Sequence, residues 1–480
     1  MKKINNIYIA LMLLVFGACD DFDSDLDVQN LEEPSSTQIG IESTADNLFK
    51  NWYQTVNSYY GPGLALATMS DQMTASYGNG GMRDMSSEPR VAWNNNSTYG
   101  NAVITEDYFN SLHAVLADAN AIVIGVEGDG IFSDPVKYES FARFGQAAAI
   151  GNLALFFDRV FLSDETGVVN DGEAVSYMEA INFALDKLDM AIELADAADF
   201  TVDTQINGMS LSSDEWSEFL NTFAARLLVN SARNSSERAS LDWNRVLDYA
   251  ENGLTYDLEI LSDGGVSWYS EYAYYSIYPG WLRVDMRIIN LMDSDYPDYW
   301  PADKTVLPEA SSADKRLESD FQYLSSQDFS PDRGTYHFSS YRLSRYDDYV
   351  DSGLETALPE MLMAENQLYL AEANLQLGNI AEAASIINSG SRTERGGLDG
   401  IDATEEAVDN AIFYERMVEL INTGMGLAYF EMRGRDLLQE GTPLHFPIPG
   451  AALDAAGIPN YTFGGSQGVA GEDYSNGGWR

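Results

Sequence analysis

The sequence predicts a mainly α-helical protein, a single compact domain of paired helices that carries long irregular, aromatic-rich loops. Apolar residues recur at helical spacing through most of the body of the chain. Helix pairs come from distant parts of the sequence, which favours one shared core over separate domains. Two segments, residues 60–108 and 257–353, break this pattern but are rich in Tyr, Trp, Asn and Gly. Such long irregular segments are typical of functional loops packed on a scaffold.

Composition and charge narrow the class of protein. The chain has 480 residues, of which 45% are hydrophobic, enough for a packed core. Lys and Arg total 27 and Asp and Glu total 75, so the net charge is 27 − 75 = −48. This charge repels phosphate backbones, so we expect no nucleic-acid partner. It also disfavours electrostatic docking on anionic lipid headgroups.

The N-terminus predicts a lipoprotein signal peptide over residues 1–18. Lys2 and Lys3 precede an apolar run, residues 7–16, that is shorter than the roughly 20 residues needed to span a bilayer. Small residues then lead to Cys19, the only cysteine in the chain, in the manner of a bacterial lipobox. We expect cleavage before Cys19 and lipid attachment to it, and several acyl chains would give a stable anchor. An ordinary signal peptide with a chance cysteine is the alternative.

The segment after the cysteine, residues 19–40, is acidic and then rich in Pro and Ser. This composition favours an extended, solvated tether. We expect the folded domain to occupy residues 41–480.

Helical periodicity then predicts the scaffold in order along the chain. The segments are residues 141–161, 177–195, 213–233, 242–254, 358–388 and 405–424. Ser213 and Asp242 are candidate N-caps, and Gly253 lies at the end of its helix. In residues 358–388, Gly378 separates two periodic stretches whose alanines permit close helix contact. This arrangement is typical of tetratricopeptide-like helix pairs, which bury each other's apolar faces.

Signals for catalysis are weak. The histidines His113, His337 and His445 are far apart and lack metal-ligand spacing. The sequence contains no phosphate loop, dinucleotide fingerprint or nucleophile elbow. Carboxylates are so abundant that no pair stands out as an acid/base couple. We therefore predict that the protein is not an enzyme.

We also expect no cofactor, with one open alternative. A structural calcium ion could use Asp293, Asp295 and Asp298, although their spacing does not match the calcium loop of an EF-hand.

The aromatic loops are the candidate binding region. Sugar rings have apolar faces on which Trp and Tyr stack, and hydroxyl edges to which Asn, Asp and Arg hydrogen-bond. Trp93 with Asn94 and Asn96 offers both kinds of contact within four residues. A second, dense cluster contains Trp268, Tyr269, Tyr272, Tyr274, Tyr275, Tyr278 and Trp281, followed by Arg283. Its candidate binding residues are Trp268, Tyr269, Tyr275, Trp281 and Arg283. The alternative for each aromatic residue is packing against the scaffold.

Several motifs in order resemble the SusD/RagB family of outer-membrane nutrient-binding lipoproteins. They are Cys19 with Asp20 and Asp21, "YFNSLHAVLADANAIV" (residues 108–123), "MLMAENQLYLAEANLQLGNIAEAASIIN" (361–388), "YERMVELINTGMGLAYFEMRGRDLL" (414–438) and "FPIP" (446–449). Two departures suggest a divergent branch: "GMGLAYFE" replaces the family's "GHRWFD", and Ile150 with Gly151 replaces a common Arg-Ala. They put the ligand in doubt more than the fold.

The resemblance implies a cell-surface role. Acidic residues after the lipidated cysteine resemble the surface-export signal of Bacteroidetes lipoproteins. Members of the family resemble lids on a TonB-dependent, SusC-like barrel transporter, to which they deliver captured nutrients. We therefore expect an oligosaccharide or polysaccharide ligand. Peptide binding of the RagB type, a surface glycoside hydrolase, and a scaffold that binds only proteins remain as alternatives.

Overall fold

The computed structural model describes residues 42–128, 132–326, 334–463 and 473–479. Within them the protein is mainly α-helical, as predicted. The predicted signal peptide, Cys19 and the predicted tether lie outside the described residues. The longer helices are α2 (Glu42–Asn57), α5 (Val103–Glu127), α6 (Pro135–Phe156), α7 (Tyr177–Asp196), α8 (Ser213–Asn230), α10 (Trp243–Glu251), α15 (Met363–Gln376), α16 (Ile380–Asn388) and α18 (Glu405–Val418).

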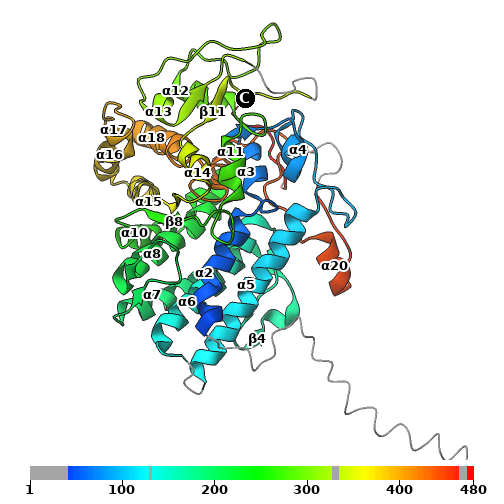
Figure 1. Ribbon diagram of the computed structural model, residues 1–480, viewed down its shortest axis with the longest axis vertical. Coiled ribbons are helices and arrows are strands. Elements are labelled where there is room, and N and C mark those ends of the chain that lie inside the picture. Colours follow the sequence, from blue (N-terminus) through cyan, green and yellow to red (C-terminus); the bar gives the residue numbers. More distant parts are fainter. Residues whose placement is uncertain (1–41, 129–131, 327–333, 464–472, 480) are drawn as a thin grey trace, which may run out of the picture.

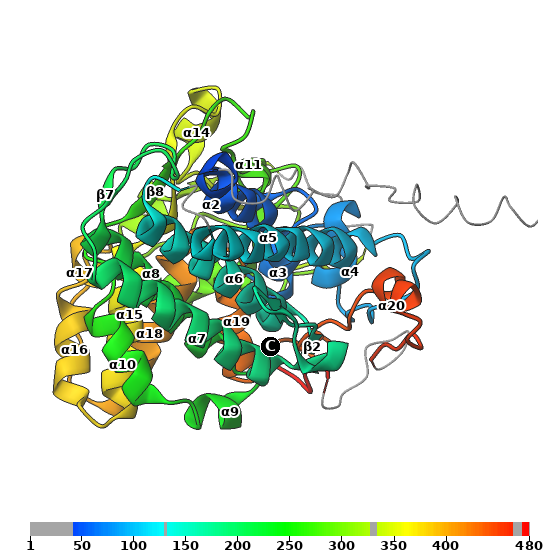
Figure 2. The same ribbon diagram turned by 90° about the horizontal axis from the view of Figure 1, so that it is seen from below.

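The long helices stack in a single array (Figures 1 and 2). Helix α5 packs on α6, α6 on α7 and α7 on α8, and the series continues through α10, α15 and α16. Helix α2 covers both α5 and α6. Helix α5 is long and apolar enough to cross a membrane, but its apolar face packs within this array. The predicted scaffold of helix pairs in one domain is therefore confirmed.

Two glycines on α6 allow its neighbours to approach closely. A Cβ at Gly145 would lie 2.6 Å from a methyl carbon of Leu48 on α2. A Cβ at Gly151 would lie 2.5 Å from a methyl carbon of Leu227 on α8. Both distances are below van der Waals contact, so α2 and α8 can pack this closely on α6 only because these two positions have no side chain. Gly151, a departure from the family motif, therefore has a packing role.

The helix caps are set by local hydrogen bonds. Asp242 caps α10 as predicted, because its carboxylate accepts a hydrogen bond from the Arg245 amide at 3.1 Å. The prediction of Ser213 as the N-cap of α8 was wrong by one residue. Ser212 is the cap, with extended backbone and a reciprocal capping box with Glu215. Ser213 lies inside the helix, and its hydroxyl donates to the Ala198 carbonyl.

Short elements occupy the two segments that lack helical periodicity. Residues 60–108 contain α3 (Gly63–Met69), β1 (Met73–Thr74), η1 (Asn79–Gly81) and α4 (Met82–Ser86), and also the start of α5. Residues 257–353 contain β8 (Leu258–Leu261), α11 (Glu271–Ile277), β9 (Arg283–Val284), α12 (Met286–Met292), α13 (Arg316–Ser319), β10 (Phe321–Tyr323), β11 (Tyr341–Leu343) and α14 (Asp347–Asp351).

The remaining elements are likewise short. They are β2 (Arg159–Val160), β3 (Ser163–Asp164), β4 (Gly167–Val168), η2 (Asn170–Gly172), β5 (Val175–Ser176), β6 (Thr201–Val202), β7 (Leu211–Ser212), α9 (Ser235–Ala239), β12 (Ala357–Met361), α17 (Ser391–Glu394), α19 (Leu427–Gly434) and α20 (Gly450–Ala456). The described strands form antiparallel two-stranded ladders, which pair β1 with β9, β10 with β11, β12 with β8, β2 with β5, β3 with β4 and β6 with β7.

Two buried arginines join the ends of α6 and α8 to the C-terminal region. Arg433 donates hydrogen bonds to the carbonyls of Asn230 and Leu155, at 2.7 and 3.0 Å, and also to those of Ala232 and Leu444. Arg233 donates to the carbonyls of Ala154, Phe157 and Ser231. Ala154, Leu155 and Asn230 lie in the last turns of α6 and α8, where a helix C-terminus leaves carbonyls without intrahelical partners. A cation is also favoured there by the helix dipole.

The same region positions the "FPIP" motif. Phe446 pairs with Phe157 in an isolated parallel bridge, and its ring stacks on Phe156 with centroids 4.5 Å apart. The C-terminal segment is thereby fixed against the end of α6.

Replacement of Arg433 by Met should destabilise the fold by about 3–5 kcal/mol, because several buried carbonyls would lose their donor. Denaturant unfolding followed by circular dichroism would measure this change. Arg83 is a matched control, because its side chain is half exposed and its nearest carboxylate oxygen is 3.7 Å away. Arg83→Met should change the free energy of unfolding by about 0.5 kcal/mol or less. Equal effects of the two substitutions would contradict a structural role for Arg433.

Candidate functional site

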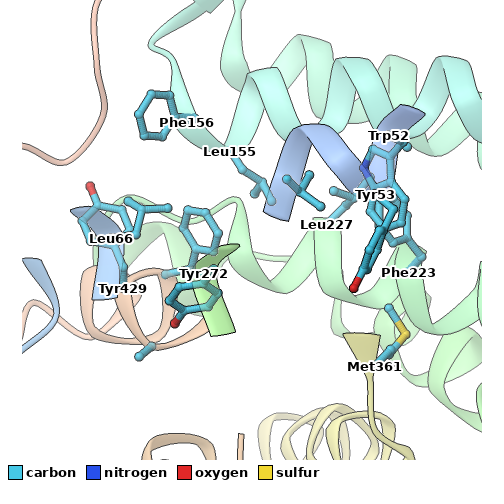
Figure 3. Close-up of a cluster of buried hydrophobic side chains, with 14 of the residues drawn as sticks. Trp52, Tyr53, Leu66, Leu155, Phe156, Phe223, Leu227, Tyr272, Met361 and Tyr429 are labelled. Atoms are coloured by element: carbon cyan, nitrogen blue, oxygen red, sulfur yellow. The ribbon is translucent and has the colours of Figure 1, made fainter. Parts of the chain in front are cut away.

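Helix α11 presents aromatic residues on two sides. Its N-cap is Ser270, whose Oγ accepts a hydrogen bond from the Ala273 amide at 3.0 Å. Tyr272 is buried, and a Cβ at Gly63 of α3 would lie 3.3 Å from its ring. Tyr272 belongs to the same buried cluster as Trp52 and Tyr53 of α2 (Figure 3). This inward side fixes α11 to the core and leaves its other side toward solvent.

A continuous group of aromatic rings lies on the outward side of α11. Some of its rings come from α11 itself, and others come from the chain that follows α11 and from the turn that follows α2. We call this group the aromatic platform. It consists of Tyr59, Tyr60, Tyr274, Tyr275, Tyr278 and Trp281. Trp281 stacks on Tyr275, with ring centroids 4.5 Å apart, and contacts Tyr278 at 4.7 Å. Such pairs contribute about 0.5–1.5 kcal/mol beyond the area that they bury.

The platform is partly open to solvent. Tyr60 is 45% exposed and Tyr275 is 8% exposed. Tyr59, Tyr274, Tyr278 and Trp281 are half-buried. The platform therefore combines one buried ring, that of Tyr275, with rings that remain partly accessible to solvent.

Polar groups lie at the margin of the platform. Asn79, which is exposed, donates a hydrogen bond to the Tyr275 hydroxyl at 3.1 Å. Arg342 donates to the Ile277 carbonyl and forms a two-point ion pair with Asp347, at 2.7 and 2.6 Å. These groups can hydrogen-bond to hydroxyls of a ligand that lies across the rings.

Two of the platform tyrosines, Tyr59 and Tyr278, are held in their neutral form. A hydrogen bond to Tyr274 raises the pKa of the Tyr278 hydroxyl. Burial, followed by a hydrogen bond to Tyr275, raises the pKa of Tyr59 well above its usual value. Burial also raises the pKa of the nearby Glu271 carboxyl. The hydroxyls of Tyr59 and Tyr278 can therefore both donate and accept hydrogen bonds.

Two of the open clefts in the described part of the chain lie away from the platform. One has a volume of about 500 Å³ between β12, α14 and α17, and the other about 660 Å³ between α7, α8 and α10. Several carboxylates line each cleft, and Tyr249, Tyr346 and Tyr349, which also line them, are buried. The partly exposed rings of the platform line neither of these two clefts.

The structure places some of the predicted ligand-binding residues in the platform and the others elsewhere. Tyr275 and Trp281 lie in the platform. Trp268 is half-buried and packs against Tyr53 and Phe49, with ring centroids 5.7 and 6.4 Å apart. Tyr269 is also half-buried. Arg283 lies in the core, where its guanidinium donates to the carbonyls of Pro279 and Ser339.

Trp93 also lies in the core, where it is only 1% exposed. Its ring packs edge-on against Phe446 and Tyr99, and Thr462 donates a hydrogen bond to its carbonyl. A sugar could stack on Trp93 only if the C-terminal segment moved away. Asn94 and Asn96 are exposed, but their side-chain oxygens accept hydrogen bonds within the same turn.

Tyr59 and Tyr60 are platform residues that lie outside both predicted aromatic clusters. Tyr274 and Tyr278 belong to the second predicted cluster, although they were not among its candidate binding residues. Their spacing of four residues places them on one side of a helix. The proximity of Tyr59 and Tyr60 depends on the tertiary fold.

One of the candidate calcium ligands, Asp293, has structural partners. Asp293 accepts hydrogen bonds from the amides of Asp295 and Ser311, at 3.0 and 2.8 Å. Among the described residues, no group of three or more His, Cys, Asp or Glu side chains is arranged to hold a metal ion. The three histidines also lie apart, each beside a different partner.

The fold is similar to that of solved SusD-like structures. The match to a SusD superfamily protein from Bacteroides vulgatus covers 88% of this chain and 97% of that protein, with 14% sequence identity and a TM-score of 0.58. A second, from Parabacteroides distasonis, covers 86% and 97%, with 14% identity and a TM-score of 0.60. A SusD-like carbohydrate-binding protein from Bacteroides fragilis covers 82% and 86%, with 13% identity and a TM-score of 0.56.

These likenesses extend over most of the chain. No protein-family model and no curated protein matches the sequence. The protein is thus a helix-pair scaffold that displays an aromatic platform. Its fold is similar to that of solved SusD superfamily proteins, which confirms the fold that the resemblance implied.

The buried ring of α11 and the exposed ring of the platform should respond differently to substitution. Tyr272→Ala removes a buried ring and should lower the free energy of unfolding by about 3 kcal/mol or more. Tyr60→Ala removes an exposed ring and should lower it by about 0.5 kcal/mol or less. Urea unfolding of both variants would measure the difference. A similar loss from both variants would show that Tyr60 is not at the surface of the platform.

Proposed function

We propose that this protein is a non-enzymatic binding protein whose aromatic platform captures a glycan. The observation that supports this proposal is the platform itself, in which several rings are partly open to solvent beside polar side chains. Solved structures of the same fold include proteins described as SusD-like carbohydrate-binding proteins, which favours the same ligand class.

The chemistry of the platform suits a sugar. The apolar face of a pyranose ring can stack on Trp281 or Tyr278, as it does on other flat aromatic surfaces. Its hydroxyls can then hydrogen-bond with Asn79 and with the tyrosine hydroxyls. A surface with several neighbouring rings also suits a chain of sugars, because successive residues can occupy successive rings.

The proposed setting is the cell surface. Cys19 would be lipidated and would anchor the protein in the outer membrane, and residues 19–40 would separate the anchor from the helical domain. The protein would deliver its ligand to a TonB-dependent, SusC-like barrel transporter. The lipobox and the acidic residues that follow Cys19 support this setting.

Removal of platform rings should weaken glycan binding. We expect Tyr278→Ala and Trp281→Ala each to lower the affinity about fivefold, as the loss of roughly 1 kcal/mol of stacking would. Isothermal titration against a panel of neutral oligosaccharides and peptides would measure it. Tyr299→Ala is a matched control, because Tyr299 is 47% exposed and packs on His337 outside the platform. This control should leave the affinity unchanged.

The same panel separates the alternatives. Binding of peptides alone would contradict the glycan proposal and favour RagB-like peptide uptake. Release of reducing ends from any glycan by the purified protein would instead indicate a glycoside hydrolase. Binding of neither class, with retention of a barrel transporter, would indicate a scaffold.

Substitution of the lipid-attachment residue should release the protein from the membrane. Cys19→Ala leaves no thiol for acylation, so the variant should not incorporate a labelled fatty acid and should fractionate as a soluble protein. The control is the pair Asp20→Asn and Asp21→Asn, which retains the thiol and should retain the label. Protease accessibility on intact cells would show whether these acidic residues direct export. Labelling of the Cys19→Ala variant would contradict the predicted anchor.

A further inference from the structure

A short series of hydrogen bonds connects the platform helix to a buried carboxylate. The α11 cap, Ser270, donates its hydroxyl hydrogen to Asn57 Oδ1 at 2.8 Å. Asn57 then donates through Nδ2 to Glu360 Oε2 at 3.3 Å. Asn57 ends α2, and Glu360 lies on β12. The series thus links three elements that are distant in sequence.

Glu360 shares one guanidinium with a second carboxylate. Arg226 binds Glu365 at two points, 2.7 and 2.8 Å, but reaches Glu360 Oε1 only at 3.3 Å. Glu365 also accepts a hydrogen bond from the Tyr369 hydroxyl at 2.8 Å. Glu365 therefore takes most of the charge compensation, and Glu360 is the less stabilised anion of the pair.

The titratable and charged groups that face Glu360 in the described part of the chain are Tyr53 of α2, Tyr108 of α5, Arg226 of α8 and Glu365 of α15. Arg226 is the cation among these four groups. Burial, opposed only in part by Arg226 and Asn57, raises the pKa of Glu360 to about 7. The carboxyl therefore changes its protonation state within the range of ordinary environments.

The charge of Glu360 sets the strength of the series. Asn57 Nδ2 donates both to Glu360 and to the Tyr53 carbonyl at 3.2 Å, and both groups accept, so the Asn57 oxygen is presented to Ser270. In this arrangement the Ser270 hydroxyl has an acceptor and its oxygen remains free to cap α11. A hydrogen bond to an ionised carboxylate is roughly twice as strong as one between neutral groups, so protonation of Glu360 weakens its hold on the Asn57 amide. The acceptor of the buried Ser270 hydroxyl is then less firmly positioned, and the cap of α11 is weakened.

We propose that Asn57 and Ser270 are positioning residues through which ionisation of Glu360 orders α11 and, with it, the aromatic platform. The consequence for ligand capture rests on the function proposed above. Above neutral pH the cap is firm and the platform is ordered. Below it the cap loosens and the affinity of the platform falls.

Hydrogen exchange without ligand tests this proposal directly. After correction for intrinsic rates, the α11 amides of the full chain should open about threefold to tenfold more often at pH 5.5 than at pH 8.5, as a weakened cap allows. Asn57→Leu and Glu360→Gln should show the faster opening at both pH values. The amides of α16 serve as an internal reference. Ser176→Ala, which removes the cap of α7, is the matched control and should leave α11 unchanged.

A second measurement separates positioning from loss of stability. The folded-state pKa of Glu360 lies above its ordinary value of 4.5, so its contribution to stability is complete below about pH 4.5 and is lost as the pH rises through about 7. Glu360→Gln should therefore have a Tm at pH 8.5 no lower than that of the unchanged protein, even though α11 opens faster. A lower Tm together with faster exchange across the whole protein would overturn the proposal.

The outcomes also separate this proposal from the function. Equal α11 exchange at both pH values in the unchanged protein would overturn the link to Glu360, whether or not a glycan binds. A pH-dependent α11 in a protein that binds no glycan would support the link and contradict the proposed function. Where a glycan does bind, its affinity should be about threefold to tenfold lower at pH 5.5, and Glu360→Gln should abolish this difference.

Discussion

The fold depends on the satisfaction of helix-end carbonyls by buried arginines. Helices α6 and α8 end side by side in the core, where water cannot bond their last carbonyls. Arg433 and Arg233 supply the missing donors, and the ring of Tyr177 lies 4.1 Å from the Arg233 guanidinium. Arg433 also donates to the Leu444 carbonyl, so the same contact sets the path of the chain that leads to Phe446. The position of the C-terminal segment, and with it the burial of Trp93, follows from this arrangement.

The aromatic residues of this protein have two distinct roles, and the distinction is made by helix geometry. On α11, Tyr272 packs against α3, while Tyr274 and Tyr278 contact Trp281 on the outer side. The inner ring holds the helix, and this attachment allows the outer rings to keep a fixed arrangement without being buried themselves. A binding surface built in this way is pre-organised, so less conformational entropy is lost when a ligand binds.

Local patterns in the sequence predicted what local physics determines. Helical periodicity located the series from α6 to α10 and that from α15 to α18, but it did not predict α2 or α5. The carboxylate of Asp242 identified a cap, because caps and periodicity both depend on residues within one or two turns. Tyr275 and Trp281 were also among the predicted binding residues, since their cluster is dense within one segment. Burial is different, because it depends on partners far along the chain. Trp93 is covered by Phe446 and Thr462, and Tyr60 joins the platform from the turn that follows α2. The composition of the aromatic segments therefore could not show which of these residues is buried and which lies in the platform.

The chain has many carboxylates and few cations, and its buried carboxylates differ in how many arginines they contact. Their pKa values differ as a result. Glu431 accepts from three guanidiniums, those of Arg238, Arg416 and Arg435, and they hold its pKa well below the usual value. This carboxylate remains ionised and acts as a permanent structural junction. Glu360 has only a share of Arg226, and its pKa rises to about 7. The same pairing of arginine with glutamate therefore gives a fixed anion in one part of the core and a titrating one behind the platform. The number of cations around each carboxylate decides which.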